Sequence, residues 1–426
     1  MTGRRFVIVD RAFTEFEGHH RSANELIAGA AAALGYVPVV LASKGARITH
    51  LDQGAPVEPL FEGSPYASAA EADAVRLGEL NREAYTDFQR VPDAFLGEEA
   101  ALYIHTTNEN EVYGLSRWLA EASARRGCIG TVALMMPPGI HVDGDEVHVI
   151  DQPKASVYKR ALDVLGSAQS NIVVQGISRS IAHEYSVLAG RDIHSTPALI
   201  RGVGRPLVDR STHSRPRILL YIGDIKVDKG FHLIPQIALR LSQSSLAFDA
   251  FIQVSGSMVD RYQRFITALE QAVGGDDRFH LHHGRLSDDD YDRVWSTSDL
   301  AVLPYSPLKY RHQSSGMCWE AMNNCVPSIV AAGTWHEREM TSWGFAPVVV
   351  DTYWPQAFFE AIASALSDLG RLTQACVLQR DKFTEHNKPE DFVTDLLRLH
   401  NDRARSSNDA RFNGQLDQNI SGALSF

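Results

Sequence analysis

The stretch that decides the fold runs from residue 218 to residue 254, ILLYIGDIKVDKGFHLIPQIALRLSQSSLAFDAFIQV. It opens on a short apolar run, Ile218 to Ile222, which is typical of a strand buried on both faces. A helix with one apolar face is expected as far as about Leu241, and a second apolar run spans Ala250 to Val254. A strand, a helix and another strand in this order predict a βαβ unit and therefore a parallel sheet.

The same alternation fills both halves of the chain. In the first half we expect strands at 6–9, 37–41, 102–104, 131–134 and 172–174, and helices at about 22–34, 113–125 and 178–188. The second half continues with strands at 279–282, 300–303 and 328–331, and with helices ending near 272 and spanning 288–295 and 315–323. Residues 205–216, RPLVDRSTHSRP, carry two prolines and no periodicity, so they are the best candidate for a linker.

The predicted fold class is α/β, with two Rossmann-like, doubly wound domains facing across a cleft. We assign residues 1–207 to the first domain and 208–385 to the second, followed by a C-terminal helix and polar tail at 386–426. Little order is expected after about Arg405, where the sequence is polar and aperiodic. Ligands of such sheets bind at the carboxyl ends of the strands, so the expected site is the cleft between the domains.

Composition and charge exclude several classes of protein. The 426 residues are 44% hydrophobic and 22% charged, as in globular rather than disordered chains. The 41 Lys and Arg against 52 Asp and Glu give a net charge of −11, which argues against a nucleic-acid-binding protein. Four scattered cysteines show no zinc-binding spacing, and we expect reduced, buried thiols. The apolar run at 6–9 is too short for a signal peptide, and the uncharged stretch at 26–43 is broken by Gly35 and Pro38. A cytoplasmic protein is therefore expected.

The segment 221–230, YIGDIKVDKG, carries the first candidate for binding chemistry. Gly223 at the end of a strand would let a ligand approach the backbone closely. Lys229, next to the start of a helix, would meet an anion that the helix terminus also favours. Taken alone, Lys229 is more simply explained as a solvated surface lysine.

The segment 314–327, SSGMCWEAMNNCVP, carries the second candidate. Ser314, Ser315 and Gly316 open a helix whose amide groups and positive dipole end would suit a diphosphate. Glu320 lies four residues beyond Gly316, on the same helix face, where its carboxylate could accept hydrogen bonds from two ribose hydroxyls. A surface glutamate behind a serine cap is the alternative for this segment in isolation.

Other clusters of polar residues give weaker indications of a binding or catalytic role. Gly18, His19 and His20 are expected in a loop after the first strand, where the backbone would approach a donor phosphate, and His105 ends another strand. The histidines at 280, 282 and 283 have no partner at metal-ligand spacing, so no metal site is expected. Asp143-Gly144 predicts a hairpin turn, and Ser287 followed by three aspartates predicts a capped helix start.

These motifs resemble those of the retaining nucleotide-sugar glycosyltransferases of the two-Rossmann-domain (GT-B) type, in the group 1 or GT4-like branch. Gly223, Ile225, Lys229 and Gly230 match one motif of that branch, and Glu320, Ala321, Met322 and Pro327 match another. The resemblance implies a nucleotide-sugar donor on the second domain, with Lys229 neutralising the diphosphate and Glu320 holding the ribose. It implies an acceptor hydroxyl on the first domain, no protein nucleophile and no metal cofactor.

The chain departs from this pattern at three positions. Asp224 stands where the family has an arginine, and the nearby Lys226 lies on the wrong side of the turn to replace it. His312 stands where the family has the first of its paired glutamates, and Met136 stands where it has a histidine. His105 or His19 would then supply an imidazole.

The predicted function is transfer of a sugar from a UDP- or GDP-sugar to a hydroxyl acceptor with retention, with Lys229, Glu320 and His105 as the catalytic candidates. The acceptor would be a small molecule, a glycan or a lipid-linked molecule, the last with weak membrane association. The alternatives are a GT-B epimerase or phosphorylase, or a degenerate GT-B protein that acts as a non-catalytic partner. A nicotinamide-dependent dehydrogenase is disfavoured because no G-x-G-x-x-G motif follows a strand.

Overall fold

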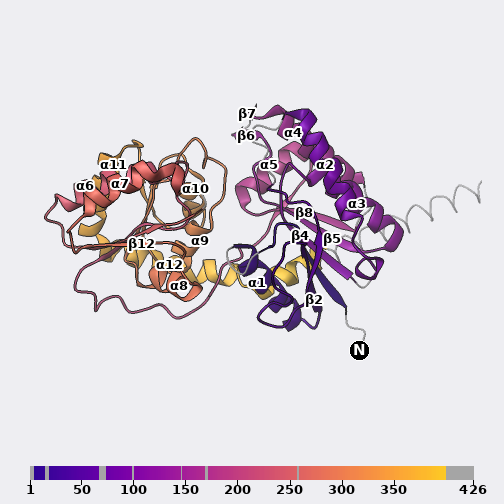
Figure 1. The fold of residues 1–426 in the computed structure, drawn as a ribbon, viewed down its shortest axis with the longest axis horizontal. Coiled ribbons are helices and arrows are strands. Elements are labelled where there is room, and N and C mark those ends of the chain that lie inside the picture. The colour runs from indigo at the N-terminus through magenta and orange to yellow at the C-terminus, as the bar shows by residue number, and fades with distance from the viewer. Residues whose placement is uncertain are drawn as a thin grey trace, which may run out of the picture. The chain divides into compact units, whose positions relative to one another are not determined.

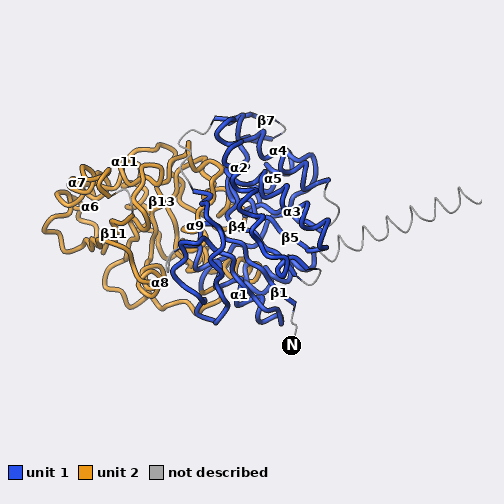
Figure 2. The backbone as a smooth tube through the Cα atoms, turned by 45° about the vertical axis from the view of Figure 1, so that its right-hand side comes forward, with its two compact units in different colours: residues 1–201, 387–426 blue, residues 202–386 orange. Residues whose placement is uncertain are grey.

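The computed structural model describes residues 4–14, 19–66, 73–97, 100–144, 146–167, 171–256 and 259–399. The chain forms two compact units, residues 1–201 with 387–426 and residues 202–386 (Figure 2). The division falls a few residues before the expected boundary after residue 207. The expected C-terminal segment at 386–426 is not separate, because the chain from 387 onward is part of the first unit. The predicted tail after Arg405 lies outside the described residues.

The first unit is built on a parallel seven-stranded sheet in the order β3-β2-β1-β4-β5-β8-β9. Its strands are β1 (Arg5–Asp10), β2 (Val37–Ser43), β3 (Val57–Phe61), β4 (Ala100–Thr107), β5 (Ile129–Leu134), β8 (Ile172–Gly176) and β9 (His194–Ser195). The helices are α1 (His19–Ala33), α2 (Ala74–Phe88), α3 (Val112–Arg126), α4 (Gln152–Ser167) and α5 (Arg179–Ala189). An antiparallel hairpin, β6 (Ile140–Asp143) and β7 (Glu146–Val149), contains the predicted Asp-Gly turn, with Gly144 at a φ of +58°.

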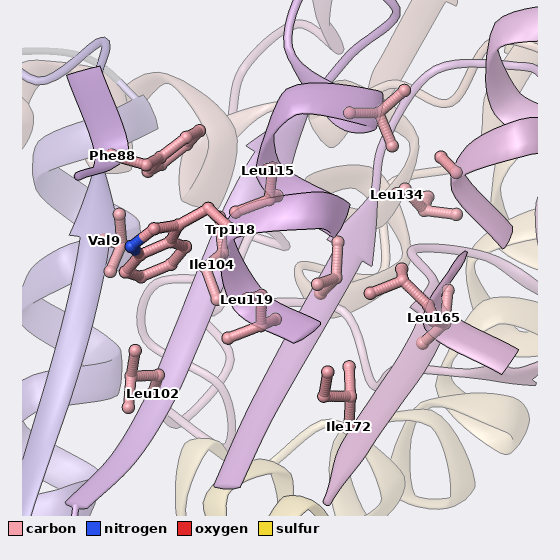
Figure 3. Close-up of a cluster of buried hydrophobic side chains, with 14 of the residues drawn as sticks. Val9, Phe88, Leu102, Ile104, Leu115, Trp118, Leu119, Leu134, Leu165 and Ile172 are labelled. Atoms are coloured by element: carbon pink, nitrogen blue, oxygen red, sulfur yellow. The ribbon is translucent and has the colours of Figure 1, made fainter. Parts of the chain in front are cut away.

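The central strands β1, β4, β5 and β8 are buried on both faces, as their continuous apolar sequences predict, whereas the edge strands β3 and β9 are partly exposed. Val7 and Val9 of β1 pack with residues of α2, α3, α4 and α5, among which Trp118 stacks on Phe88 with ring centroids 5.2 Å apart (Figure 3). Phe6 and Ile8 point to the opposite face, which α1 covers (Figure 1). The helical segment 389–399 covers the same face and contributes Phe392, Val393 and Leu396. Each of these fully buried side chains contributes about 1.5–3 kcal/mol to folding.

The second unit repeats the arrangement with a parallel six-stranded sheet in the order β12-β11-β10-β13-β14-β15. The strands are β10 (Arg217–Tyr221), β11 (Asp249–Val254), β12 (Phe279–His283), β13 (Leu300–Leu303), β14 (Ser328–Ala331) and β15 (Val348–Val350). The helices are α6 (Ile234–Ser242), α7 (Gln263–Val273), α8 (Asp288–Thr297), α9 (Gly316–Asn323), α10 (Trp335–Ser342), α11 (Pro355–Ser367) and α12 (Leu369–His386). The apolar face of α6 packs on this sheet together with α7 and α11, as the spacing of its apolar residues predicts.

The start of helix α8 agrees with the sequence-based prediction, and the start of α1 does not. Ser287 caps α8, since its hydroxyl accepts a hydrogen bond from the amide of Asp290 at 3.1 Å, which confirms the capped start. The expected loop through His19 and His20 is wrong, because α1 begins at His19 and not near Ser22. No helix in the described part of the chain is both long enough and apolar enough to cross a membrane.

Candidate functional site

The strand order of the second unit reverses between β10 and β13. In open α/β sheets the loops that leave the carboxyl ends of two such strands diverge to opposite faces and leave room for a ligand. Here the loop after β10 carries Gly223 and Lys229, and the loop after β13 leads into α9. The structure therefore brings both sequence motifs to one edge of one sheet.

Gly223 forms a tight turn that is held by side chains of the neighbouring strand. Its φ is +92°, and its amide donates to Oε1 of Gln253 at 2.8 Å. The amide nitrogen of Gln253 donates in turn to the carbonyl of Gly284 at 2.9 Å. A Cβ atom at Gly223 would lie 3.2 Å from Cε of Met317 and 3.7 Å from Nζ of Lys229. The turn, the lysine and the first turn of α9 are thus immediate neighbours.

Lys229 is directed into this corner and is part-buried. Burial lowers the pKa of its ammonium group, and the nearby Asp224 carboxylate opposes that shift. The next residue, Gly230, has a φ of +79°, and a Cβ there would lie 1.9 Å from the carbonyl oxygen of Pro304. The loop after β10 therefore packs directly against the end of β13, and this contact sets the position of the lysine.

The start of α9 is open. Gly316 is exposed, and no other atom lies within 4 Å of the position that its Cβ would take. The Ser315 hydroxyl does not cap the helix but donates to the hydroxyl of Tyr305 at 3.4 Å. Ser314, just before it, is part-buried. The space beside Gly316 is therefore open at the positive end of the helix dipole, while the Cys318 amide donates to the carbonyl of Ser315 at 3.1 Å.

Glu320 lies one turn further along α9, close to Tyr291 of α8. Burial, and then the Glu320 carboxylate, raise the pKa of the Tyr291 hydroxyl well above its usual value. That hydroxyl donates to Sδ of Met317 at 3.3 Å. Met317 is also the neighbour of Gly223, so a continuous row of contacts links the glycine turn, the helix start and the neighbourhood of Glu320.

Lys226 belongs to the same loop as Lys229 but is exposed. Its exposed side chain lines a cavity of about 610 Å³ together with Arg261, Arg264 and two aromatic rings, Tyr262 and Phe265. Lys229 is not among the residues that line this cavity.

In the first unit, His105 lies at the carboxyl end of β4 inside a hydrogen-bonded cluster. Its Nε2 atom is 3.2 Å from Oδ2 of Asp10 and 2.9 Å from Oδ1 of Asn24, and its Nδ1 atom is 2.7 Å from the hydroxyl of Thr106. Nδ1 of His20, in the first turn of α1, is 2.9 Å from the same Asp10 oxygen. Asp10 ends β1, which pairs with β4, so this cluster occupies the strand-order reversal of the first sheet.

Asp10 is the charged centre of the cluster. Burial opposes ionisation of its carboxyl, but the imidazoles of His105 and His20 outweigh burial and hold its pKa well below its usual value. One ligand atom each from Asp10, His20 and His105 lies within 4.8 Å of the others, a spacing that could also hold a cation. In the structure the carboxylate receives donors from both histidines, from Asn24 and from the Ala12 amide, which satisfy it by hydrogen bonding alone.

The other residues that the sequence singled out lie in three different places. Gly18 lies outside the described residues, and His19 is the first residue of α1. The backbone carbonyl at Met136 accepts a hydrogen bond from the Tyr185 hydroxyl at 2.7 Å, so this position has a structural contact after β5. His312 lies in the loop between β13 and α9 and is part-buried.

Sequence reasoning missed Asp10 and Gln253 and gave no role to Tyr291. Asp10 directly follows the apolar run of the first strand, which was the available signal. Gln253 is a polar residue inside a buried strand, and such residues need a partner. Tyr291 carried no signal, because its proximity to Glu320 depends on how α8 and α9 pack.

Neither a family model nor a curated protein matches this sequence. Solved structures do match its fold. The α,α-trehalose 6-phosphate synthase of Burkholderia multivorans has a TM-score of 0.67 and 12% identity, covering 96% of this chain and 98% of that one. HepE of Anabaena in complex with UDP has a TM-score of 0.59 and 14% identity, with 95% and 100% covered. A glycosyltransferase from Rickettsia africae has a TM-score of 0.60 and 11% identity, with 94% and 99% covered. The chain has the GT-B fold with two Rossmann-like domains, as the sequence predicted.

Proposed function

We propose that the protein is a metal-independent glycosyltransferase that moves a sugar from a UDP- or GDP-sugar to a hydroxyl acceptor with retention of configuration. The observation that carries this proposal is the part-buried Lys229 ammonium group beside the Gly223 turn and the open start of α9. The fold supports it, as does the fact that HepE, a structural neighbour, was solved with UDP-glucose.

In this proposal the departing diphosphate is the main target of stabilisation. As the bond between the sugar and the phosphate breaks, negative charge grows on the phosphate oxygens. Lys229 and the first amides of α9 are fixed in place before the reaction and can compensate that charge without reorganisation. Glu320 then accepts hydrogen bonds from the ribose hydroxyls. Asp224 near Lys229 leaves the site with less net positive charge, so we expect modest affinity for the free nucleotide.

Calorimetric titration with UDP and with GDP tests the donor site. Lys229→Ala should weaken binding of the preferred nucleotide about 10- to 100-fold, since a hydrogen bond to a charged group contributes about 1.5–3 kcal/mol. Lys226→Ala is the matched control, because this lysine lies three residues earlier in the same loop but is exposed. It should change the affinity less than about twofold, as expected for an exposed charge. Equal losses in both variants, or no binding of either nucleotide at millimolar concentration, would contradict the proposal.

A non-catalytic GT-B protein is the second candidate, and the carboxylate of Asp224 beside Lys229 favours it, because it repels a diphosphate. This candidate predicts that no UDP- or GDP-sugar is cleaved, whether or not the free nucleotide binds. It also predicts that Lys229→Ala and Glu320→Ala leave the protein's cellular role unchanged. Release of UDP or GDP from a nucleotide sugar by the wild-type protein would exclude it.

A further inference from the structure

Three side-chain nitrogen atoms of the first unit converge on one oxygen of Asp10. Oδ2 of Asp10 lies 2.9 Å from Nδ1 of His20, 3.2 Å from Nε2 of His105 and 2.9 Å from Nδ2 of Asn24. The other oxygen, Oδ1, accepts a hydrogen bond from the amide of Ala12 at 3.1 Å. The carboxylate is satisfied, but each of its oxygens has two lone pairs, so three donors crowd around Oδ2 and share them. Oδ2 is thus the point where two imidazole nitrogens meet.

The spacing of these atoms fits a small divalent cation. Oδ2 of Asp10, Nδ1 of His20 and Nε2 of His105 all lie within 4.8 Å of one another. Zn²⁺ binds such atoms at about 2.0–2.2 Å in a tetrahedral arrangement, which separates neighbouring ligand atoms by about 3.3–3.6 Å. The observed separations of 2.9 and 3.2 Å from Oδ2 to the two nitrogens are shorter than this by about 0.1–0.7 Å. A side-chain movement of that size makes room for the ion between the three atoms.

Each histidine also has a partner for its outer nitrogen, the one that does not contact Asp10. Nε2 of His20 is 3.1 Å from the hydroxyl of Tyr66, and Nδ1 of His105 is 2.7 Å from the hydroxyl of Thr106. A hydroxyl oxygen can accept a hydrogen bond, so each outer nitrogen can carry the proton of its ring. The inner nitrogen is then bare, as a metal ligand must be. Metal-binding histidines almost always have such an outer acceptor, which fixes the orientation of the ring.

The surroundings of Asp10 hold more buried carboxylates than buried cations. Asp87 and Glu111 are both buried, and both pair with Arg11, at 2.9 and 2.7 Å. Arg11 is the one buried arginine or lysine in the described part of the chain, while Arg90, which contacts Asp87 at 3.3 Å, is exposed. Burial, and also the charges of Asp10 and Asp87, raise the pKa of the Glu111 carboxyl against the effect of Arg11. Three buried carboxylates thus share one buried guanidinium, and a divalent cation beside Asp10 would offset the excess negative charge.

We propose that Asp10, His20 and His105 bind a divalent transition-metal ion, and that Zn²⁺ is the ion their chemistry suits. Two imidazoles and one carboxylate are a common set of Zn²⁺ ligands, whereas Mg²⁺ and Ca²⁺ prefer sites built from oxygen. On binding, the proton of each imidazole moves from the inner to the outer nitrogen, so the cluster loses no proton. Three protein ligands leave a fourth position for water, at the strand-order reversal where sheets of this type bind ligands. The glycosyl transfer proposed above assigns no step to this ion, so either proposal can fail without the other.

Titration of the untagged, full-length protein with Zn²⁺ against a chelating dye measures the affinity and the stoichiometry. The wild type, first stripped of metal, should bind about one ion per chain. His20→Gln and His105→Gln should each weaken binding more than about 100-fold, because loss of a ligand's outer partner alone costs about 10- to 100-fold. Tyr66→Phe removes only such an outer partner and should weaken binding about 10-fold.

His50→Gln is the matched control, because it changes an exposed histidine of the same unit, and it should bind Zn²⁺ as the wild type does. Circular dichroism shows whether each variant is folded as the wild type is. A wild type that binds no Zn²⁺ at micromolar concentration would overturn the proposal. So would folded His20→Gln and His50→Gln variants that bind the ion equally well.

Nitrogen-15 NMR of labelled histidine tests the site in the wild type, so it does not depend on whether a variant folds. One equivalent of Zn²⁺ should shift the signals of Nδ1 of His20 and Nε2 of His105 together, with the protons on the two outer nitrogens. Signals that stay unchanged, or a shift of His50 alone, would place the ion elsewhere and overturn the assignment. The titrations with UDP and GDP decide the donor site separately. A protein that binds Zn²⁺ in this way but neither nucleotide would support the metal site and contradict the proposed function.

Discussion

His336 has an unusual environment for an ionisable residue. It is the second residue of α10, its exposure is 0%, and its ring packs against Tyr305 and Tyr310. Neither ring nitrogen has a hydrogen-bond partner within the described part of the chain. Burial, followed by the positive charges of Lys229 and Arg338, lowers its pKa to about 3. The imidazole is therefore neutral in the folded protein over the whole physiological range.

This residue should make the protein less stable in mild acid. Between about pH 6.5 and pH 3 the unfolded chain binds a proton at His336 that the folded chain does not, so stability falls as the pH falls. At pH 5 the loss amounts to about 2 kcal/mol relative to pH 7. His336→Phe should reduce the difference between the two pH values by that amount, as measured by urea unfolding at pH 7 and pH 5. Asp10 does not interfere, because its stabilising charge is lost only below its unfolded pKa of about 3.9. An equal pH dependence in the wild type and the variant would show that His336 titrates normally.

The loop between β10 and the short 3-10 turn at Phe231–Leu233 depends on Gly230. Two effects act on a side chain there, the positive φ of +79° and the 1.9 Å approach to Pro304. Gly275 has a similar φ of +81° but nothing within 4 Å of its Cβ position, so it separates the two effects. Gly275→Ala should cost about 1–2 kcal/mol, because only the backbone is strained.

Gly230→Ala should cost about 1–3 kcal/mol more than Gly275→Ala, because the loop must also move away from β13. Since that loop carries Lys229, the same substitution should weaken UDP or GDP binding, whereas Gly275→Ala should not. Urea unfolding and calorimetry measure the two effects. If both variants lose equal stability and both bind nucleotide normally, the contact with Pro304 does not position the lysine.

The first unit is completed by a segment that follows the second unit in the sequence. Phe392, Val393 and Leu396 are buried against the face that α1 covers, and Tyr103 meets Phe392 edge to face with ring centroids 5.3 Å apart. Asn387 is also buried, and its Oδ1 atom accepts a hydrogen bond from the Ala198 amide at 2.7 Å. The chain thus leaves the first unit once, forms the second, and returns.

A chain that ends at His386 should therefore lose stability in the first unit and not in the second. Removing three buried apolar side chains costs about 5 kcal/mol. A chain that ends at Leu399 is the control, because it keeps residues 387–399. Differential scanning calorimetry should show a lower transition temperature for the first unit only in the shorter chain, while UDP or GDP binding to the second unit is retained. A loss of nucleotide binding in the shorter chain, or equal thermal profiles in both, would contradict this division of the molecule.

Local sequence pattern was sufficient to predict the alternation of strands and helices, two doubly wound domains and the position of the two motifs in the second unit, and the resemblance of those motifs to a known family implied the GT-B type. Burial of a strand on both faces leaves a continuous apolar run, and a helix on a sheet leaves a 3.6-residue period, so both are visible within ten or fifteen residues. The segment that returns to the first unit, the start of α1 and the cluster around Asp10 came only from the folded chain. Asp10, His20 and His105 meet because β1 and β4 are neighbours and α1 begins beside them. Such contacts depend on strand order and helix packing, which are set by the summed burial of the whole domain and leave no pattern in any single stretch of residues.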